Sequence, residues 1–600
     1  MFWVLFFLVG KGIFLVYHSA RTKDLSPAEV AKVFLYGLRL DASFAAYLSV
    51  LPFLLFFIRS LVPRLDGSRW LLGYTCSFVV LQAVFTMVDL ELYGAWGFRL
   101  DATPLQYLST PREMLASASS APLLLLSILL LALALGSCLL YGRFFRRLPT
   151  ITYRDLLYSG WCLFLIAFLI LPIRGGWQQI PLNQSDVYFS DKAFANHAAV
   201  NVSWNLMYSI SKKNYDQQNP YGYFPDSVAQ SLVQQLYSRK DKPGAPSVLR
   251  NPRPNVLFII LESYTGKLVG SLGGEAGVTP NLDKIARQGI LFDSIYASGD
   301  RSEKGLVALL SAYPVQTTTS IIKTPRKTEN LAHINKVLKN LGYATSFYYG
   351  GELAFANIKS YLLSAGYGRL LSKYDFDSDH YNSKWGVHDH ILLDRVLQDL
   401  RQEKQPFFST VFTLSSHEPY DIPIPAKFKG KDEATQFKNA MYYTDYALGR
   451  FWEAAQKEPW WDNTLVILAA DHGHRLPGND PNDAPTKFRI PLILAGGALK
   501  EKGQLISRLG SQTDIVPTVL SQMRLPLGAF PWGKDLLDPG TRSFAFYVFN
   551  DGFGFITPQG ALTFDNVPKK VIQQDPGVPA AQLDWGKAYM QYSFGDFLRR

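Results

Sequence analysis

Long hydrophobic runs are concentrated in the first 175 residues, whereas the rest of the chain mixes shorter apolar runs with amphipathic ones. Each long run is close to the ~20 residues that a helix needs to cross a bilayer. They predict five transmembrane helices, roughly at 2–18, 43–62, 70–90, 121–141 and 155–174. Lys11 interrupts the first run and is expected to snorkel or to lie inside the helix bundle. The basic segment 19–42 predicts an interfacial helix on the outer leaflet.

Arginines in the short loops between these runs predict the orientation of the chain in the membrane. Because cytoplasmic loops carry an excess of Lys and Arg, we expect the second-to-third and fourth-to-fifth loops to be cytoplasmic. No Ala-x-Ala-like cleavage site follows the first run, so a cleaved signal peptide is not expected. The N-terminus then lies inside, and the chain after about residue 175 lies outside. The arginines concerned are Arg59, Arg64 and Arg69 in one loop and Arg143, Arg146 and Arg147 in the other.

From residue 254 onward, apolar strand patterns alternate with amphipathic helix patterns. This alternation predicts an α/β domain with a mostly parallel central sheet. The last sixty residues predict short antiparallel strands with tight turns. The expected organisation is a five-helix transmembrane domain (1–175), a juxtamembrane helical linker (176–253), a catalytic domain (254–540) and a small C-terminal β subdomain (541–600).

Charge and cysteine content exclude several functions. The net charge of +11 comes partly from cytoplasmic-loop arginines, and no Lys/Arg-rich tract carries interleaved aromatics, so nucleic acid is not an expected partner. A basic surface near an anionic membrane explains the charge more simply. Cys76, Cys138 and Cys162 all fall in predicted spans, so the exported part has no disulfide, cysteine ligand or cysteine nucleophile.

Two apolar runs far apart in the chain stop on candidate metal ligands. Residues 255–261 precede Glu262, and residues 464–470 precede Asp471 and His472. Both runs are rich in Val, Ile and Leu, which predicts buried strands of a parallel sheet. Ligands bind at the carboxyl ends of such strands. Carboxylates and imidazoles are hard-metal and zinc-type ligands, so the sequence predicts a divalent cation at this edge.

A polar, glycine-bounded loop at 299–305 precedes an apolar helical run and contains Ser302. Backbone N–H groups at a helix start favour an anion such as a phosphoryl oxygen. Beside a divalent cation the serine hydroxyl becomes a usable nucleophile, so we expect Ser302 to be both nucleophile and ligand. Taken alone, each residue also has a structural explanation. Ser302 is better explained as a helix N-cap than as a nucleophile, Glu262 as half of an ion pair, and His417 as a hydrogen-bonded structural histidine. Their combination at one sheet edge favours a site.

The order of these motifs is informative beyond each motif alone. The relevant stretches are Asn255 to Ser263, Thr279 to Asp283, Ser302 ahead of Tyr313-Pro314, Ser416 to Tyr420, and Asp471 to Gly473. Together with the five predicted spans, this order resembles the lipoteichoic acid synthase family. That family is a sulfatase-like branch of the alkaline phosphatase superfamily.

The resemblance implies a sulfatase-like fold and a manganese or magnesium ion, with zinc also possible. By matching motif, Glu262, Asp471 and His472 would be metal ligands, Ser302 nucleophile and ligand, and His417 a contact of the substrate phosphate. Further candidates for substrate binding flank these motifs, namely Arg301, Lys304 and His474.

The chain departs from the family pattern in two places. The family nucleophile is usually threonine, and Ser302 keeps the hydroxyl but loses the methyl that restricts its rotamer. The region where the family has a substrate arginine and tryptophan, residues 349–357, contains neither. Two related families fit less well. Sulfatases mature a Cys/Ser-x-Pro-x-Arg motif, and Ser302 does not begin such a motif. Lipid phosphoethanolamine transferases usually carry disulfides in the exported domain, whereas the exported part of this chain has no cysteine.

The expected function is that of a multi-pass protein of the bacterial inner membrane with its catalytic domain on the outer face. It would move a phosphoglycerol-type headgroup from a phospholipid to a glycan or polymer hydroxyl through a phospho-serine intermediate. With water as acceptor it would be a phosphodiesterase, and phosphoethanolamine transfer remains a related alternative. A non-catalytic lipid sensor that has lost its metal is the alternative from another class.

Overall fold

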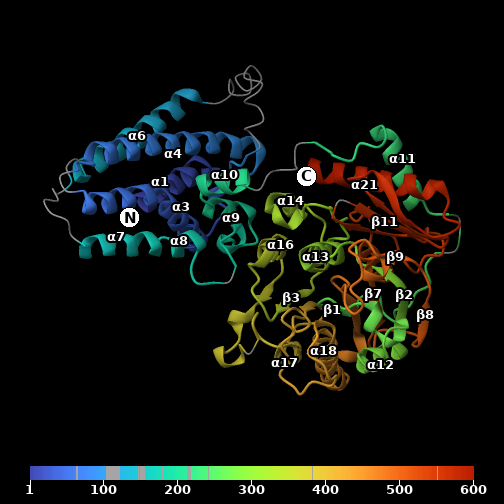
Figure 1. The fold of residues 1–600 in the computed structure, drawn as a ribbon. Helices are drawn as coiled ribbons and strands as arrows, with labels where there is room; N and C mark the ends of the chain where they lie inside the picture. Colours follow the sequence, from blue (N-terminus) through green and yellow to red (C-terminus); the bar gives the residue numbers. More distant parts are fainter. Residues whose placement is uncertain are drawn as a thin grey trace. The chain divides into compact units, whose positions relative to one another are not determined.

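The computed structural model describes residues 1–62, 65–102, 122–145, 148, 156–178, 180–211, 218–240, 242, 244–381, 383–550 and 552–600. The chain forms two compact units, Met1–Tyr215 and Asp216–Arg600 (Figure 1). The segment predicted as a linker is therefore divided between them. Helices α9 (Ala193–Ala199) and α10 (Val202–Ser211) belong to the first unit, and α11 (Asp226–Tyr237) belongs to the second.

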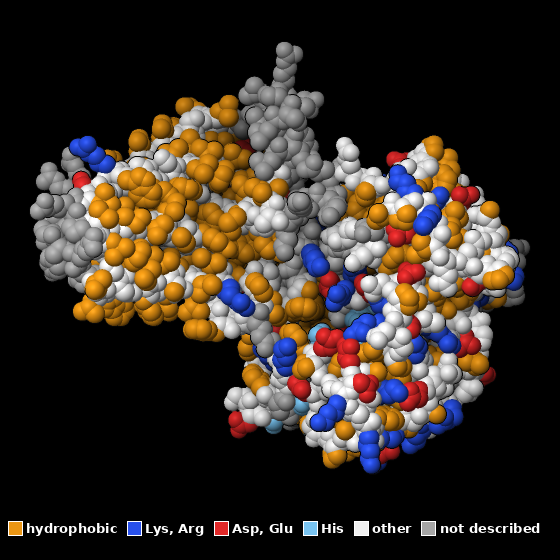
Figure 2. Space-filling view, in the orientation of Figure 1, with side chains coloured by type: hydrophobic (Ala, Val, Ile, Leu, Met, Phe, Trp, Pro, Cys, Tyr) orange, Lys and Arg blue, Asp and Glu red, His pale blue; other side chains and the backbone are white. Residues whose placement is uncertain are grey.

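The first unit consists mainly of apolar helices. They are α1 (Phe2–Tyr17), α3 (Pro27–Leu61), α4 (Ser68–Trp96), α6 (Leu123–Phe145), α7 (Leu156–Phe168) and the short α8 (Ile170–Arg174). By length and composition, four stretches of the described chain can cross a membrane: Pro27–Leu61, Ser68–Gly94, Leu123–Phe145 and Leu156–Arg174. Hydrophobic side chains cover much of the visible surface of these helices (Figure 2), which is typical of a lipid-facing surface.

Two expectations for this unit need correction. The count of five spans is not confirmed, because α1 has 16 residues and would rise only about 24 Å, short of the ~30 Å hydrocarbon core. The separate interfacial helix expected over 19–42 is wrong, because α3 begins at Pro27 and continues to Leu61. A capping box between Ser26 and Glu29 fixes that start. Of the arginines used for orientation, Arg64, Arg146 and Arg147 lie outside the described residues.

Buried polar contacts tie α9 and α10 to the long helices. Lys11 of α1 forms an ion pair with Asp41 of α3, and both side chains are almost fully buried. The amide of Asn201 donates to the same Asp41 carboxylate over 2.8 Å. Nearby, Arg99 donates to the His197 carbonyl over 2.8 Å. Such groups are costly inside an apolar bundle unless they are paired, so these contacts specify how the segment after α8 folds back onto the bundle.

The second unit is built around a nine-stranded sheet. Its strands are β1 (Asn255–Leu261), β2 (Ile290–Tyr296), β3 (Ala344–Tyr349), β4 (Arg369–Leu371), β5 (Phe407–Phe412), β6 (Thr464–Ala470), β7 (Arg489–Ala495), β8 (Gln504–Ile506) and β9 (Gly510–Ser511). Eight follow the order β4-β3-β5-β1-β6-β7-β2-β8, and β9 pairs with β2. All pairings are parallel except those of β7, which runs antiparallel to β6 and β2. The predicted mostly parallel α/β sheet is confirmed.

Helices connect and cover these strands (Figure 1). They include α12 (Pro280–Gln288), α13 (Ser302–Ser311), α14 (Pro325–Glu329), α15 (Ile334–Asn340), α16 (Ile358–Ser364), α17 (Asp389–Leu400), α18 (Glu433–Ala455) and α20 (Ile515–Gln522). The carboxyl ends of β1, β2, β3, β5 and β6 all face one edge of the sheet, since these strands run in the same direction. The polar residues after those strands therefore meet there.

A second, four-stranded antiparallel sheet follows near the C-terminus. It consists of β10 (Ala545–Phe549), β11 (Gly552–Thr557), β12 (Gly560–Asp565) and β13 (Lys570–Gln574). The chain then ends in helix α21 (Ala580–Arg599), which the sequence pattern did not predict. A Cβ at Gly586 of α21 would lie 2.3 Å from the Phe553 ring, so this glycine lets the helix pack closely on β11.

The Lys11–Asp41 pair gives a test of the first unit. Replacing Asp41 with Ala leaves a buried ammonium without its counter-charge, which costs about 3–5 kcal/mol. We expect Asp41→Ala to lower the melting temperature and the folded yield of the full chain in detergent. The Lys11→Met/Asp41→Leu double variant removes both charges and should recover most of the loss. Equal stability of Asp41→Ala and the unsubstituted chain would contradict the pairing.

Candidate metal and nucleophile site

The pairing of β1 with β6 brings two carboxylates together. Leu261 and Ala470 are register partners in this parallel pair, so Glu262 and Asp471 leave neighbouring strands at the same level. The Asp471 amide donates to the Leu261 carbonyl over 3.1 Å, which extends the pairing by one residue. Both carboxyl groups are almost fully buried. The strand register therefore places two acids side by side at the catalytic edge.

Only one oxygen of the Asp471 carboxylate has a hydrogen-bond partner among the described residues. Its Oδ1 accepts from the backbone amides of Ser263 and His472, each over 2.8 Å. Its Oδ2 is buried without a hydrogen-bond donor. A buried carboxylate oxygen left in this state is costly unless a cation satisfies it.

The imidazole of His472 faces the same point. Its Nδ1 lies 2.7 Å from the Gly473 carbonyl, which assigns the Nδ1 proton to that bond and leaves Nε2 as the acceptor. Nε2 lies 3.6 Å from Glu262 Oε1 and 3.6 Å from Asp471 Oδ2. Ligand atoms of Glu262, Asp471 and His472 all lie within 4.8 Å of one another. Two carboxylate oxygens and one imidazole nitrogen fit a divalent cation.

Ser302 completes this group. Its Oγ lies 3.2 Å from Glu262 Oε2 and 3.5 Å from His472 Nε2. The sequence placed Ser302 just before a helix, but it is the first residue of α13, and Arg301 occupies the N-cap position. The hydroxyl thus lies at a helix start, where backbone N–H groups favour a phosphoryl oxygen.

Burial and mutual repulsion alter the acid–base properties of these ligands. Burial and, second, the negative charge of Asp471 raise the pKa of Glu262 to about 8. Burial lowers the pKa of His472, but the two carboxylates more than offset this and raise it overall. Two like charges held this close cost free energy, and a bound cation would relieve that cost.

Close backbone packing holds Ser302 against the end of β6. A Cβ at Gly305 in α13 would lie 1.9 Å from the Asp471 carbonyl oxygen. The loop before α13 is held in turn by Asp300, whose carboxylate lies 3.7 Å from the ammonium of Lys304 and 3.5 Å from that of Lys487. The position of Ser302 therefore depends on the absence of a side chain at residue 305 and on an ion-pair cluster.

Gln512 is a positioning residue that the sequence pattern did not reveal. Its fully buried side chain donates to the carbonyls of Ala470 and Asp471 over 2.8 and 2.6 Å. It also accepts from the Ser298 amide over 2.9 Å, and Val548 of β10 donates to the Ser298 carbonyl over 3.0 Å. Gln512 therefore links the end of β6 to the loop that precedes Ser302. A lone glutamine outside any motif gives no sequence signal of this role.

The remaining sequence candidates lie around this group in different ways. His417 is half-buried at the end of the turn after β5, and the neighbouring Ser416 hydroxyl donates to the Glu262 carbonyl over 2.5 Å. Arg301 is exposed beside Ser302. The ammonium of Lys304 is buried and donates to the Thr317 carbonyl over 3.0 Å, so it supports the loop from within the protein.

His474, which the sequence predicted as a substrate-binding residue, lies among aromatic side chains. Its ring lies 4.2 Å from that of Phe437 and 6.5 Å from that of Tyr420. Its Nδ1 accepts from the Leu476 amide over 3.1 Å. Burial lowers the pKa of His474 to about 3, so it is neutral at physiological pH. These contacts describe a packed structural side chain.

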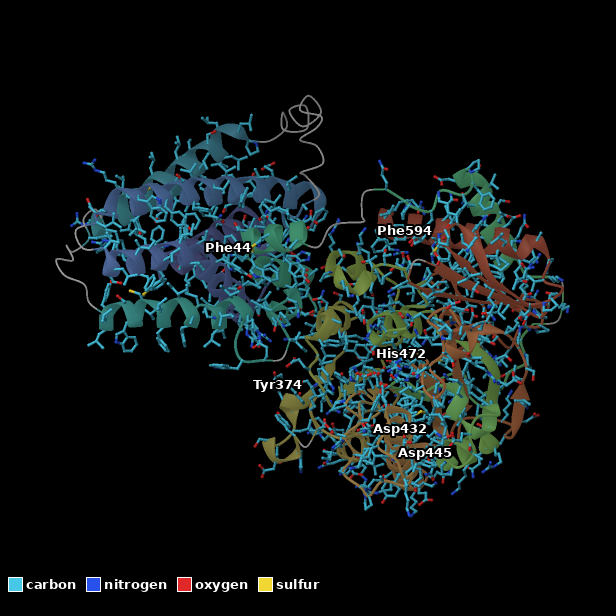
Figure 3. The ribbon with its side chains drawn as sticks, viewed as in Figure 1. Phe44, Tyr374, Asp432, Asp445, His472 and Phe594 are labelled. Carbon is cyan, nitrogen blue, oxygen red and sulfur yellow. The ribbon has the colours of Figure 1, made fainter. Side chains whose placement is uncertain are left out.

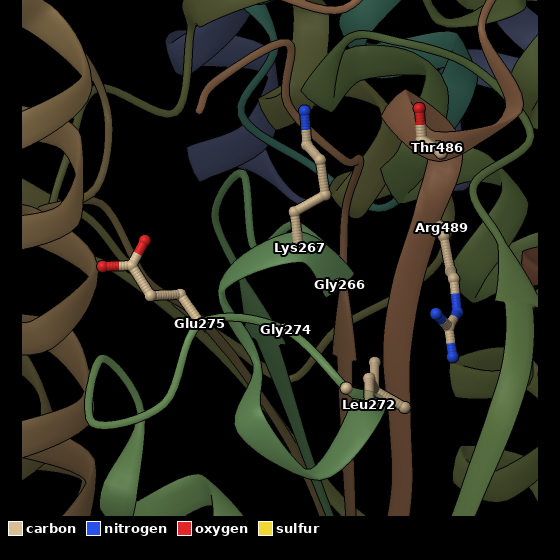
Figure 4. Close-up of a pocket in the computed structure, with 8 residues that line it drawn as sticks. Gly266, Lys267, Leu272, Gly274, Glu275, Thr486 and Arg489 are labelled. Atoms are coloured by element: carbon tan, nitrogen blue, oxygen red, sulfur yellow. The ribbon is translucent and has the colours of Figure 1, made fainter. Parts of the chain in front are cut away.

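A cavity of about 470 Å³ lies apart from these ligands. Its lining includes Lys267 and Arg489, whose side chains extend in different directions (Figure 4). The Lys267 ammonium is already bound by the Arg475 and Pro477 carbonyls, and Arg489 donates twice to the Asp293 carbonyl. Lys267 and Arg489 therefore stabilise the fold. The cavity lining does not include Glu262, Ser302, Asp471 or His472.

The ligand group predicts selective binding of a divalent cation. Asp471→Asn removes one charge and one ligand oxygen, so Mn²⁺ affinity should fall by more than the roughly 10–100-fold typical of outer-shell substitutions. Titration calorimetry of the full chain with Mn²⁺ measures this. Asp462→Asn, a substitution of an exposed aspartate, is the control. Equal Mn²⁺ affinity in Asp471→Asn would exclude this residue as a ligand.

The packing of α13 on β6 gives a second test. Gly305→Ala should force α13 away from Asp471, at a cost of at least about 1–3 kcal/mol. Both the melting temperature and the Mn²⁺ affinity should decrease, because Ser302 moves with the helix. The control is Gly528→Ala, since a Cβ there meets open space. If Gly305→Ala matched the control in both measurements, the close contact would have no role.

Comparisons with known proteins agree with this architecture. A family model described as Sulfatase matches residues 254–525. The "Lipoteichoic acid synthase-like YvgJ" of Bacillus subtilis is 24% identical over 327 residues, which cover 50% of this chain and 52% of that protein. "Phosphoglycerol transferase I" of Xanthomonas euvesicatoria is 27% identical over 432 residues, covering 66% and 53%. The chain thus spans about half the length of the curated relatives it matches.

Solved structures give the same result for the fold. A protein in the alkaline phosphatase superfamily from Vibrio parahaemolyticus is 27% identical, with a TM-score of 0.56 over 63% of this chain and 97% of its own. The lipoteichoic acid synthase LtaP from Listeria monocytogenes is 18% identical, with a TM-score of 0.51 over 62% and 98%. Residues 254–525 therefore match the sulfatase family model, and this chain is similar to lipoteichoic acid synthase-like proteins and shares the fold of an alkaline phosphatase superfamily protein.

Proposed function

We propose that this chain is a membrane-anchored phosphotransferase that moves a phosphoglycerol-type headgroup from a phospholipid to a glycan or polymer hydroxyl. The observation that carries the proposal is the approach of the Ser302 hydroxyl to Glu262 and His472, which cluster with Asp471. The names of two relatives, a lipoteichoic acid synthase-like protein and a phosphoglycerol transferase, support the transferred group.

The reaction proceeds in two steps, in which the phospho-serine first forms and is then discharged. Ser302 Oγ attacks the phosphorus of the donor phosphodiester, the bond from phosphorus to the diacylglycerol oxygen breaks, and the serine proton ends on diacylglycerol. An acceptor hydroxyl then attacks the phospho-serine, and the Ser302 oxygen regains a proton as it leaves. The start of α13 and the exposed Arg301 beside it favour the negative phosphoryl oxygens in both steps. His417 contacts the same phosphate from the turn after β5.

Glu262, Asp471 and His472 would hold one divalent cation, with Ser302 Oγ as a further ligand. The buried Oδ2 of Asp471, which has no hydrogen-bond partner in the described part of the chain, supports this assignment. Manganese or magnesium fits the oxygen-rich set, and zinc is also compatible with it. When bound, the ion would lower the pKa of a ligating hydroxyl and stabilise negative charge on the transferred group. Gln512 and Gly305 keep the ligand strand and the nucleophile in register for that purpose.

The first unit supports a multi-pass location in the bacterial inner membrane, with the phospholipid donor taken from the bilayer. Four of its described helices are long and apolar enough to cross a membrane. We place the sulfatase domain on the outer face, as the loop arginines favour. An intact ligand set and nucleophile argue for an enzyme over a metal-free lipid sensor, because a sensor has no need of either.

The proposal is tested by trapping the intermediate. Incubation of the full chain with headgroup-labelled phospholipids and Mn²⁺, followed by peptide mass spectrometry, should show a labelled group on Ser302. Ser302→Ala should lose the adduct and reduce turnover by on the order of 10⁴ or more. Ser302→Thr keeps a hydroxyl and should retain both. Normal turnover by Ser302→Ala would refute the nucleophile, and release of free headgroup without transfer would make the protein a phosphodiesterase.

A further inference from the structure

An aromatic-rich segment lies beside His417 at the catalytic edge of the sheet. It comprises residues 373–381 and 383–386, which come after β4. Tyr374 and Tyr381 are 63% and 39% exposed, and Trp385 is half-buried. Tyr374 lies at the margin of the second unit, whereas His472 lies within it (Figure 3).

Trp385 is held in one orientation. Its indole N–H donates to the Glu418 carbonyl over 2.5 Å. Its ring centroid lies 5.1 Å from that of His417, and the two ring planes are 73° apart. A rigid aromatic side chain loses little conformational entropy when a ligand packs on it.

The backbone next to Trp385 is fixed to the sheet. The Val387 amide donates to the Gly350 carbonyl over 3.0 Å, directly after β3. A Cβ at Gly386 would lie 2.0 Å from the Gly350 carbonyl oxygen, and the φ of Gly386 is +152°. Residue 386 therefore has to be glycine, and Trp385 is anchored at the edge where β3 and β5 end.

We propose that Trp385, together with His417, forms a subsite for a sugar ring of the acceptor. That the bound sugar belongs to the acceptor rests on the proposed transferase function. The contacts of Trp385 define the sugar subsite independently of that function. The weakly positive C–H groups of a pyranose pack against the negative face of an indole ring. A sugar seated on Trp385 would present its hydroxyls beside His417.

The charges of the segment favour a neutral glycan over a bilayer surface. Asp375, Asp377 and Asp379 are all exposed, whereas the segment has two lysines, Lys373 and Lys384. Anionic lipid surfaces attract clusters of Lys and Arg, and three exposed carboxylates oppose such binding. Carboxylates accept hydrogen bonds from sugar hydroxyls. The ammonium groups of Lys373 and Lys384 lie 5.1 and 5.3 Å from the centroids of the Tyr374 and Trp385 rings. The exposed carboxylates add hydrogen-bond acceptors, so the segment matches a polyhydroxylated, uncharged partner.

Direct binding tests this subsite without any turnover. The full chain carrying Ser302→Ala is purified in lauryldimethylamine oxide, which has no sugar headgroup. It is mixed with linear hexasaccharides of glucose, galactose or N-acetylglucosamine. We expect saturation-transfer NMR to detect contact with the ring C–H protons of at least one hexasaccharide. Adding Trp385→Ala should weaken binding at least tenfold, and Trp385→Phe should retain part of it. Tyr446→Ala removes an aromatic that is 41% exposed on α18 and should change nothing.

Three outcomes overturn the subsite. They are no contact with any hexasaccharide, binding unchanged by Trp385→Ala, and binding to anionic phospholipid vesicles that instead depends on Trp385. The last outcome would identify the segment as a membrane contact. A labelled Ser302 without Trp385-dependent sugar binding would support the transferase proposal and refute the sugar subsite. Trp385-dependent sugar binding without any Ser302 adduct would support the sugar subsite and refute the proposed phosphotransfer through Ser302.

Discussion

The structure of the site depends on one parallel pairing. Because Leu261 lies opposite Ala470, the next residues of β1 and β6 are two buried acids at the same level. Two backbone amides satisfy one oxygen of Asp471, and the other has no hydrogen-bond partner among the described residues. Such an arrangement is unfavourable by itself, and stability elsewhere in the core must sustain it. A shift of register by one residue would turn one of these side chains to the other face of the sheet and abolish the ligand set.

Around this pairing, the protein uses close backbone contacts to fix distances. Gly305 brings α13 against the Asp471 carbonyl, and a Cβ at Gly473 would lie 1.9 Å from the Lys487 carbonyl oxygen. These two glycines hold the nucleophile helix and the loop after His472 against their neighbours at separations that no other residue permits. Gln512 adds directional hydrogen bonds to both sides. If these groups act as proposed, their fixed positions leave little reorganisation to be made when a substrate binds.

Much of the core was predictable from sequence, because its signal is local and strong. Continuous apolar runs identified β1 and β6, and the polar residues after them, which the sequence predicted as metal ligands, lie close together in the structure. The antiparallel direction of β7 and the existence of α21 were not predictable, since a short apolar run does not encode direction and α21 is defined by packing on β11. The length of α3 was missed because the basic character of residues 19–42 set this segment apart from the apolar run that follows, whereas one continuous helix contains both and pairs its Asp41 with Lys11.

The part of the site that sequence predicted least is its rim. Residues 349–357 lack the family's substrate arginine and tryptophan, and the indole beside His417 comes instead from residue 385. Trp385 follows no recognisable motif, and tertiary contacts, among them the close approach of Gly386 to Gly350 and the Val387–Gly350 hydrogen bond, bring it to the edge of β3. Irregular segments on a rigid sheet are free to vary without disturbing the ligand register, so they set specificity while the sheet sets chemistry. The residues of the proposed chemical step are therefore recognisable at strand ends, whereas the proposed acceptor subsite lies in a loop whose position depends on tertiary contacts.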